Sequence, residues 1–279
     1  MVAAVSRDIS FSAYSDSAIV SQKDCLDHIA EYTASGSGAW EILYVVDQVL
    51  SYVRLLPSLA EGGRTLIGRV SDAVNTVGLA LSIPAVFSDC VTLRNSVIRL
   101  YELKDLPTAD PFRHRKILLG SKAVVLDALM LTNNFTYIPY LLEHLKIHLF
   151  EARHLPIFEG IYNVSSILLE GAEFVEEGLK LNQYYSLDKS SMTLVQKLRI
   201  EEKQCLSWMV VAKDVSSVAI SVISIIGLIF GLAIEGVGIL AIGFLVLSSF
   251  WLTIKIVAYF YEQLVIEPHA AQSLLAGTA

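Results

Sequence analysis

The chain has 279 residues, of which 54% are hydrophobic and 18% charged, with a formal net charge of −7 at pH 7. Water-soluble domains usually carry about 45–50% apolar and about 25% charged residues, so this composition excludes a disordered or fibrous chain. The acidic balance argues against nucleic acid as a partner. The three cysteines, Cys25, Cys90 and Cys205, lie too far apart for a clustered zinc site or a disulfide framework.

Residues 1–20 are expected to form a flexible tail. They are rich in serine and show little hydropathy periodicity. They also lack the basic start, apolar centre and cleavage site of a secretory signal peptide. Such a start permits a secretion signal of another kind, and a floppy terminus is the ordinary alternative.

An all-α body is predicted for the residues that follow, in two halves, 21–106 and 107–213. Apolar residues recur every three or four positions at 40–59 and again at 85–103, which is typical of helix–helix packing in a bundle. Prolines at 107 and 111 indicate a linker between the halves. Further helices are expected over residues 116–131, 137–153, 157–184 and 192–213, and no segment shows the period-two alternation of a strand.

Two uncharged stretches of the body, residues 73–88 and 128–142, are also strongly apolar. Both are shorter than the roughly 20 residues that cross a bilayer core, and each contains a proline, Pro84 or Pro139. We therefore expect buried core helices or interfacial segments there, in contact with a membrane or a partner, and not transmembrane helices.

Hydropathy is highest in residues 214–258, which are predicted to form a transmembrane helical hairpin. Two runs without charged residues, 215–234 and 236–254, are joined by a tight turn at Glu235, Gly236 and Gly238. Each run is long enough to cross the bilayer as a helix, which satisfies its own backbone hydrogen bonds. Two alternatives stay open: a hairpin buried in a soluble domain, and a soluble bundle that releases the hairpin at a membrane. Residues 259–279 would form a short tail.

Small residues line one face of the first predicted span. Small side chains let helix backbones approach closely in lipid, where no hydrophobic force drives pairing. The second span is the expected partner of this face, and homo-oligomerisation through it is the alternative. The face consists of Ser217, Ser221, Ser224, Gly227 and Gly231.

Basic residues predict the orientation of the hairpin. Lys255 follows the second run, the turn has no basic residue, and several basic residues precede the first run. By the positive-inside bias, both chain ends should face the cytosol and the turn should be translocated. The preceding residues are Lys197, Arg199, Lys203 and Lys213.

A short basic run follows the linker, at Arg113, Arg115 and Lys116. Basic side chains near a membrane surface attract anionic lipid by about 1 kcal/mol each. The run is therefore a candidate contact for lipid head groups, and a solvated helix start is the alternative.

No metal site, cofactor or catalytic centre is predicted. His144, His148 and Glu151 would share one face of a helix over 137–153, a spacing that a metal ion can use. The polar face of an amphipathic helix explains them better. The sequence lacks nucleophile-elbow, phosphate-loop and paired-cysteine motifs, so we expect no enzymatic activity.

The serine-rich start, the helical body and the two-lobed hydrophobic hairpin resemble the inclusion membrane proteins of chlamydiae. The resemblance rests on residues 215–234, the turn at 235–238 and residues 239–254; residues 73–87 also resemble the class-I-accessible type within that group. It implies type III secretion, insertion into the host vacuole membrane, and recruitment or tethering of host proteins by ends exposed to host cytosol. A weaker resemblance, carried by the amphipathic residues 47–56 and the late membrane helices, is to the peroxins of peroxisome division, which implies membrane remodelling.

The predicted function follows from the hairpin and the helical body. The hairpin anchors the chain in a lipid bilayer, and the body presents helix faces to a protein partner on the cytosolic side. The alternative is a membrane-remodelling or pore-forming protein that acts directly on lipid.

Overall fold

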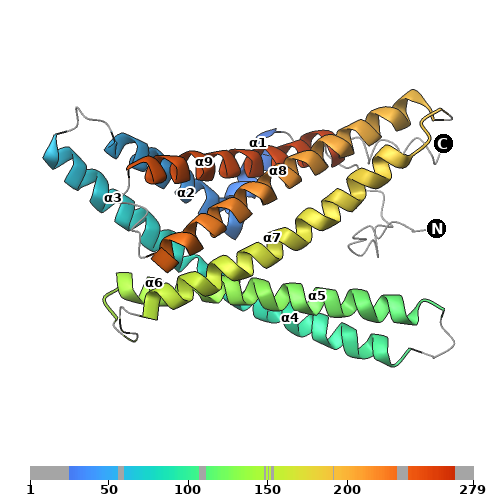
Figure 1. Cartoon of the computed structure of the whole chain (residues 1–279), viewed down its shortest axis with the longest axis horizontal. Coiled ribbons are helices and arrows are strands. Elements are labelled where there is room, and N and C mark those ends of the chain that lie inside the picture. The colour runs from blue at the N-terminus through green and yellow to red at the C-terminus, as the bar shows by residue number, and fades with distance from the viewer. Residues whose placement is uncertain are drawn as a thin grey trace.

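The computed structural model describes residues 25–55, 60–106, 111–147, 149, 151, 154–190, 192–230 and 238–267. Every secondary-structure element in these ranges is a helix, as the sequence predicts (Figure 1). The elements are α1 (Cys25–Ala34), α2 (Gly36–Arg54), α3 (Glu61–Ala80), α4 (Ser82–Lys104), α5 (Arg113–Phe135), α6 (Tyr137–His144), α7 (Leu155–Ser186), α8 (Leu194–Phe230), α9 (Gly238–Tyr261) and a π-helical turn, η3 (Glu262–Ile266).

Local chemistry explains where several helices begin. The Ser35 side chain caps α2 by accepting a hydrogen bond from the Gly38 N–H, at 3.0 Å. Gly38 cannot be replaced by a larger residue without rearrangement, because a Cβ atom there would lie 1.9 Å from the carbonyl oxygen of Tyr32. Pro84 lies in the first turn of α4, where the missing N–H of proline is tolerated.

The long helices are arranged as antiparallel neighbours (Figure 1). The most extensive contact joins α7 to α8, followed by the contacts of α4 with α5 and of α8 with α9. The end of α4, the start of α5, the end of α7 and the start of α8 lie at one end of the long axis, here called the linker end. The end of α2, the start of α3, α6 and the start of α9 lie toward the other end. The helices of the expected body therefore run alongside the hairpin helices.

The structure changes two of the expected boundaries. The helix expected over 137–153 ends at His144, and Lys146 has a positive φ of 59°, which breaks the helical path. The helix expected over 192–213 and the first predicted span form one continuous helix, α8. α4 ends at Lys104 and α5 begins at Arg113, so neither helix includes Pro111.

Candidate functional site: an apolar surface around a polar interior

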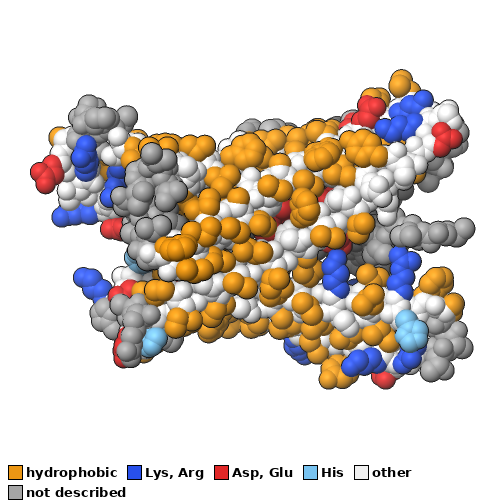
Figure 2. Space-filling view, viewed as in Figure 1, with side chains coloured by type: hydrophobic (Ala, Val, Ile, Leu, Met, Phe, Trp, Pro, Cys, Tyr) orange, Lys and Arg blue, Asp and Glu red, His pale blue; other side chains and the backbone are white. Residues whose placement is uncertain are grey.

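Large apolar side chains cover the outside of the bundle. Figure 2 shows them spread across the middle of one face, with most charged side chains toward the two ends of the long axis. Water-soluble proteins rarely expose contiguous apolar patches of this extent. Strongly exposed examples come from most of the helices and include Val49, Leu66, Phe87, Leu118, Val125, Leu168, Val175, Val222, Ile229 and Phe250.

The interior is correspondingly polar. Serine, asparagine and carboxylate side chains usually lie outside in water-soluble proteins, whereas here many are buried. In lipid the solvent outside is apolar, so small and polar residues gather between helices where they find partners. The buried polar residues include Glu41, Gln48, Ser71, Thr136, Asn163, Ser165, Ser166, Glu177, Gln204, Ser207, Asp214, Ser216, Ser221, Ser224 and Ser248.

Three segments are long and apolar enough to cross a membrane: α8, residues 242–266, and α3 together with α4. The first two belong to the predicted hairpin. The third, residues 61–104, contains the stretch 73–88, for which a core helix or interfacial segment was expected. The prediction of a buried core helix there is wrong, because only 11% of the most apolar window in residues 61–104 is buried.

The small-residue face of α8 is turned into the bundle. Ser221, Ser224 and Gly227 are buried and Ser217 is half-buried, whereas Gly231 lies outside the described residues. α8 contacts α7 as well as α9, the expected partner of this face. Interhelical packing within the chain therefore occupies the face that was also considered for homo-oligomerisation.

The two hairpin helices pack against each other and return to the same end of the molecule. The turn residues Glu235 and Gly236 lie outside the described residues, and Gly238 is the first residue of α9. At the other end of α9, η3 contacts α8. The segments that flank the hairpin are thus neighbours in space.

Buried polar contacts attach α9 to α2. The Lys255 ammonium lies 2.8 Å from a carboxylate oxygen of Glu41, which is only 3% exposed. The Tyr32 hydroxyl of α1 donates to the same carboxylate. Burial and this hydrogen bond raise the pKa of the Tyr32 phenol well above its ordinary value, so it remains the proton donor. Nearly two turns earlier on α9, Ser249 Oγ lies 3.3 Å from the side-chain amide oxygen of Gln48.

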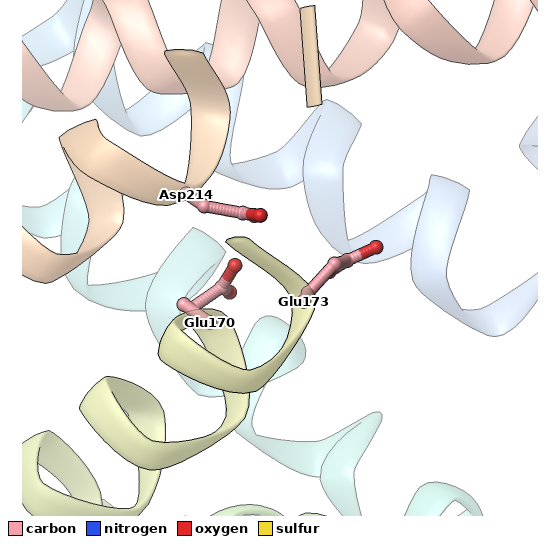
Figure 3. Close-up of side chains that lie close together, drawn as sticks. All are labelled: Glu170, Glu173 and Asp214. Carbon is pink, nitrogen blue, oxygen red and sulfur yellow. The ribbon is translucent and has the colours of Figure 1, made fainter. Parts of the chain in front are cut away.

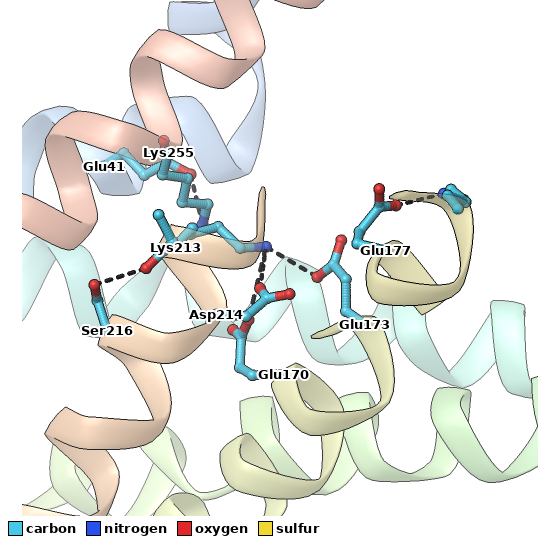
Figure 4. A network of polar contacts seen from close by, with 10 residues as sticks. Glu41, Glu170, Glu173, Glu177, Lys213, Asp214, Ser216 and Lys255 are labelled. Atoms are coloured by element: carbon cyan, nitrogen blue, oxygen red, sulfur yellow. Dashed lines mark hydrogen bonds and ion pairs between the residues drawn. The ribbon is translucent and has the colours of Figure 1, made fainter. Parts of the chain in front are cut away.

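A cluster of four charged side chains lies between α7 and α8. The Lys213 ammonium is 2.9 Å from a Glu173 oxygen, 3.1 Å from Asp214 Oδ1 and 3.6 Å from Glu170 Oε2 (Figure 4). The exposed side-chain fraction is 14% for Lys213, 22% for Glu170, 45% for Glu173 and zero for Asp214. The three carboxyl groups gather between the two helices (Figure 3). Ionisable residues inside a membrane bundle are expensive and usually functional.

Sequence reasoning missed this cluster, although the sequence contains a signal for it. Polar residues recur every seven positions on both helices, at Asn163, Glu170 and Glu177 of α7 and at Ser207, Asp214 and Ser221 of α8. Such a repeat is typical of a seam between two helices. Here it is polar, so a search for apolar periodicity passes over it.

The residues of the basic run are placed differently from one another. Arg113 is half-buried and donates from Nη2 to the carbonyl oxygen of Lys104, at 2.8 Å, which ties the two ends of the linker together. Arg115 and Lys116 are exposed on the first turn of α5. Lipid head-group contact therefore stays a prediction for these two residues, while Arg113 also has a structural role.

The histidine face considered for a metal does not form on a helix. α6 ends at His144, Glu151 lies beyond that helix, and His148 is outside the described residues. The expected helix over 137–153 would have placed all three on one side. The premise of a shared helical face is therefore wrong.

No protein-family model, curated protein or solved structure matches this chain.

Proposed function

We propose that this is an integral membrane protein whose α8–α9 hairpin anchors it in a bilayer and whose linker end binds a protein partner. The observation that carries the proposal is the apolar exterior around a polar interior. At about 1.5 Å per residue, α8 is roughly 55 Å long, which exceeds the roughly 30 Å bilayer core. The helix can therefore cross the core and still extend beyond it.

The basic residues favour one orientation of this arrangement. Lys104, Arg115, Lys116, Lys189 and Lys197 flank the two connections at the linker end. Cytosolic loops carry such an excess of lysine and arginine. We therefore place the linker end, and with it both chain ends, on the cytosolic side.

The partner-binding part of the proposal draws on the resemblance to inclusion membrane proteins. In such a protein the hairpin would insert into the host vacuole membrane after type III secretion, and the linker end would recruit or tether a host factor. The two connections and the flanks of the hairpin are gathered at that end, which favours it as the surface that faces a cytosolic partner (Figure 1).

Membrane insertion is tested by placing charge on the outer face of α8. Val222 and Ile229 are exposed, and lysine near the bilayer centre costs about 3 kcal/mol on insertion scales. We expect V222K/I229K to abolish alkaline-resistant membrane association. The matched control is E201K, an exposed position of the same helix before the apolar stretch. Alkaline extraction of the wild-type protein would contradict the proposal.

Topology is tested by cysteine labelling from each side of sealed membranes. In a chain without native cysteines, E235C and E267C report on the predicted turn and on the residue after η3. We expect a membrane-impermeant maleimide to label them from opposite sides. Labelling of both from one side would contradict a hairpin that crosses twice.

A second candidate function, direct remodelling or permeabilisation of lipid, is favoured by the third apolar segment. The α3–α4 segment exposes Leu66, Phe87 and Val91 and contributes little to the interior. Purified protein in dye-loaded liposomes separates the two functions. An anchor and tether leaves the dye inside and the liposomes round, whereas a pore former releases the dye and a remodelling protein forms tubules.

A further inference from the structure

Between α5 and α7, polar side chains face each other and apolar side chains face outward. The side-chain amide of Asn133 on α5 donates to the hydroxyl oxygen of Ser166 on α7 at 2.7 Å and to that of Ser165 at 3.1 Å. Both serines are buried. Helices of a water-soluble bundle have the opposite distribution, with the apolar stripe turned inward. The reversed pattern is typical of helices whose outer surface contacts lipid.

The outer face of α7 is apolar over a length that matches a bilayer. From Ile157 to Leu179, at about 1.5 Å per residue, the helix rises about 33 Å, close to the roughly 30 Å of a hydrocarbon core. Glu159 and Glu170 lie on the opposite side of the helix, because each residue turns it by about 100°. The residues of this outer stripe of α7 are exposed and share one side: Ile157, Ile161, Val164, Leu168, Val175 and Leu179.

α5 extends the apolar surface beside the outer stripe of α7. Val125, Met130 and Phe135 are exposed on it. Residues 123–135 contain one charged residue, Asp127, which is half-buried. This part of α5 therefore presents no exposed charge next to α7.

Basic and aromatic residues mark the limit of this surface toward the linker end. Lys180 follows the last residue of the outer stripe, and Arg115 and Lys116 are exposed on the first turn of α5. Further along α7, the Tyr185 hydroxyl oxygen accepts a hydrogen bond from the indole N–H of Trp208 on α8, at 3.2 Å. Tryptophan and tyrosine are enriched where a membrane meets water, because each combines an apolar ring with a polar group. The three helices thus share one level at which an apolar surface gives way to a membrane-interface composition.

A shallow hollow of about 400 Å³ lies between α5 and α7 on this surface. Its two hydroxyl groups donate within their own helices, Thr132 to the Ala128 carbonyl at 2.8 Å and Ser165 to the Tyr162 carbonyl at 2.9 Å. A polar ligand loses its hydrogen bonds to water on entering such a hollow, whereas an acyl chain has none to lose. The rest of the lining is largely aliphatic and includes Leu129, Ile157, Ile161, Val164 and Leu168.

We propose that the outer surface of α5 and α7 contacts lipid acyl chains, and that both helices cross the bilayer together with the hairpin. The inference rests on the proposed anchoring of α8 and α9, and it moves part of the predicted cytosolic body into the bilayer. Lipid fits this surface better than a second copy of the chain, because the exposed apolar residues continue around the bundle to Val222 and Ile229 of α8. A partner chain would cover one face only.

Mean hydropathy overlooks these two helices for a physical reason. The three candidate spans among the described residues do not include α5 or α7. An average over a window counts the inward-facing Asn133, Asn163 and Ser166 equally with the apolar residues that face outward. A helix can therefore contact lipid on one side and still have a modest mean hydropathy.

The side of the membrane on which α6 ends is the first test. In a chain without native cysteines, H144C reports on the end of α6 and S190C on the exposed residues after α7. In sealed membranes, we expect a membrane-impermeant maleimide to label H144C from the same side as E235C, and S190C from the same side as E267C. Labelling of H144C from the side of S190C and E267C, with E235C opposite, would overturn this inference and leave the hairpin in place. Labelling of all four from one side would contradict the proposed anchoring as well.

Contact with acyl chains is the second test. A fluorophore attached to V164C in proteoliposomes is exposed to lipid that carries a nitroxide at mid-chain and, separately, to iodide in the water. We expect the nitroxide lipid to quench V164C as strongly as it quenches the matched variant V222C on α8, and iodide to quench only S190C. Quenching of V164C by iodide, with V222C still quenched by the lipid, would overturn the inference alone. Protection of V164C from both quenchers would place a second chain on this surface and would also overturn it.

Discussion

The α7–α8 pair and the α4–α5 pair are both antiparallel and extensively packed, but they are stabilised in different ways. α7 and α8 enclose charged and hydroxyl side chains, several of them fully buried. α5 has no buried residue, and on α4 only Ser82 is buried. Instead, α4 and α5 expose large apolar residues such as Phe87 and Leu118. The first pair therefore forms the polar interior of the bundle, while the second faces outward on most of its surface, as a lipid-contacting pair does.

The largest loss in the free energy of unfolding is expected when the buried ammonium group of Lys213 is removed. K213M leaves three carboxylates without their cation, and breaking a buried ion pair on one side typically costs about 3–5 kcal/mol. The matched change K122M removes the exposed Lys122–Glu176 pair, which is worth at most about 1 kcal/mol. Chemical unfolding in detergent measures both. Equal effects of the two substitutions would remove the energetic distinction between the buried and exposed charges.

Enlarging a residue on the small-residue face of α8 should cause the next largest loss in the free energy of unfolding. Ser221 is 3% exposed, so S221L forces extra volume into a close helix interface and should lower the free energy of unfolding by about 1–3 kcal/mol. The neighbouring V222L is the control, because Val222 is exposed and its enlargement meets no packed helix. The midpoint of thermal unfolding reports the difference. A well-tolerated S221L would show that the face is not packed.

A smaller loss of stability is expected when the hydrogen bond to the buried Glu41 carboxylate of α2 is removed. Y32F removes the hydroxyl that donates to Glu41 but retains the ring packing against Tyr259 and the Lys255–Glu41 ion pair. A hydrogen bond to a charged group contributes about 1.5–3 kcal/mol. We expect a loss near the lower end of this range, measured as a shift of the unfolding midpoint. T33S, at an exposed position of the same helix, should leave the midpoint unchanged.

The smallest change in the free energy of unfolding is expected for a substitution between α4 and α5. A Cβ atom on Gly120 would lie 3.0 Å from Leu103 Cδ1 and 3.1 Å from Leu100 Cδ1, both of them ends of flexible side chains. The small adjustment required is offset by the roughly 1 kcal/mol gain in helix propensity of alanine over glycine. G120A should therefore change the free energy of unfolding by less than about 0.5 kcal/mol. A loss of several kcal/mol would show that this pair is as tightly packed as α7 and α8.

The sequence predicts the helical fold and the hairpin because these depend on local patterns. Long uncharged runs identify α8 and α9, and Pro107 and Pro111 locate the linker. The sequence does not predict the α3–α4 segment as a candidate span, because Pro84 and short length argue against one uninterrupted helix. Nor does it reveal that Lys213, interpreted as a topology signal, faces carboxylates from α7, since that contact depends on the register between two helices.

We propose that lipid surrounds α8 on its apolar side while its polar side faces the bundle. Spin labels placed singly from position 214 to 229 in proteoliposomes test this through their collision rates with oxygen and with a water-soluble nickel chelate. The account predicts oxygen maxima at positions 215, 222, 226 and 229, minima at 214, 221 and 224, and low nickel accessibility at positions 222, 226 and 229. High nickel accessibility at 222 and 229, without helical periodicity in oxygen, would contradict it.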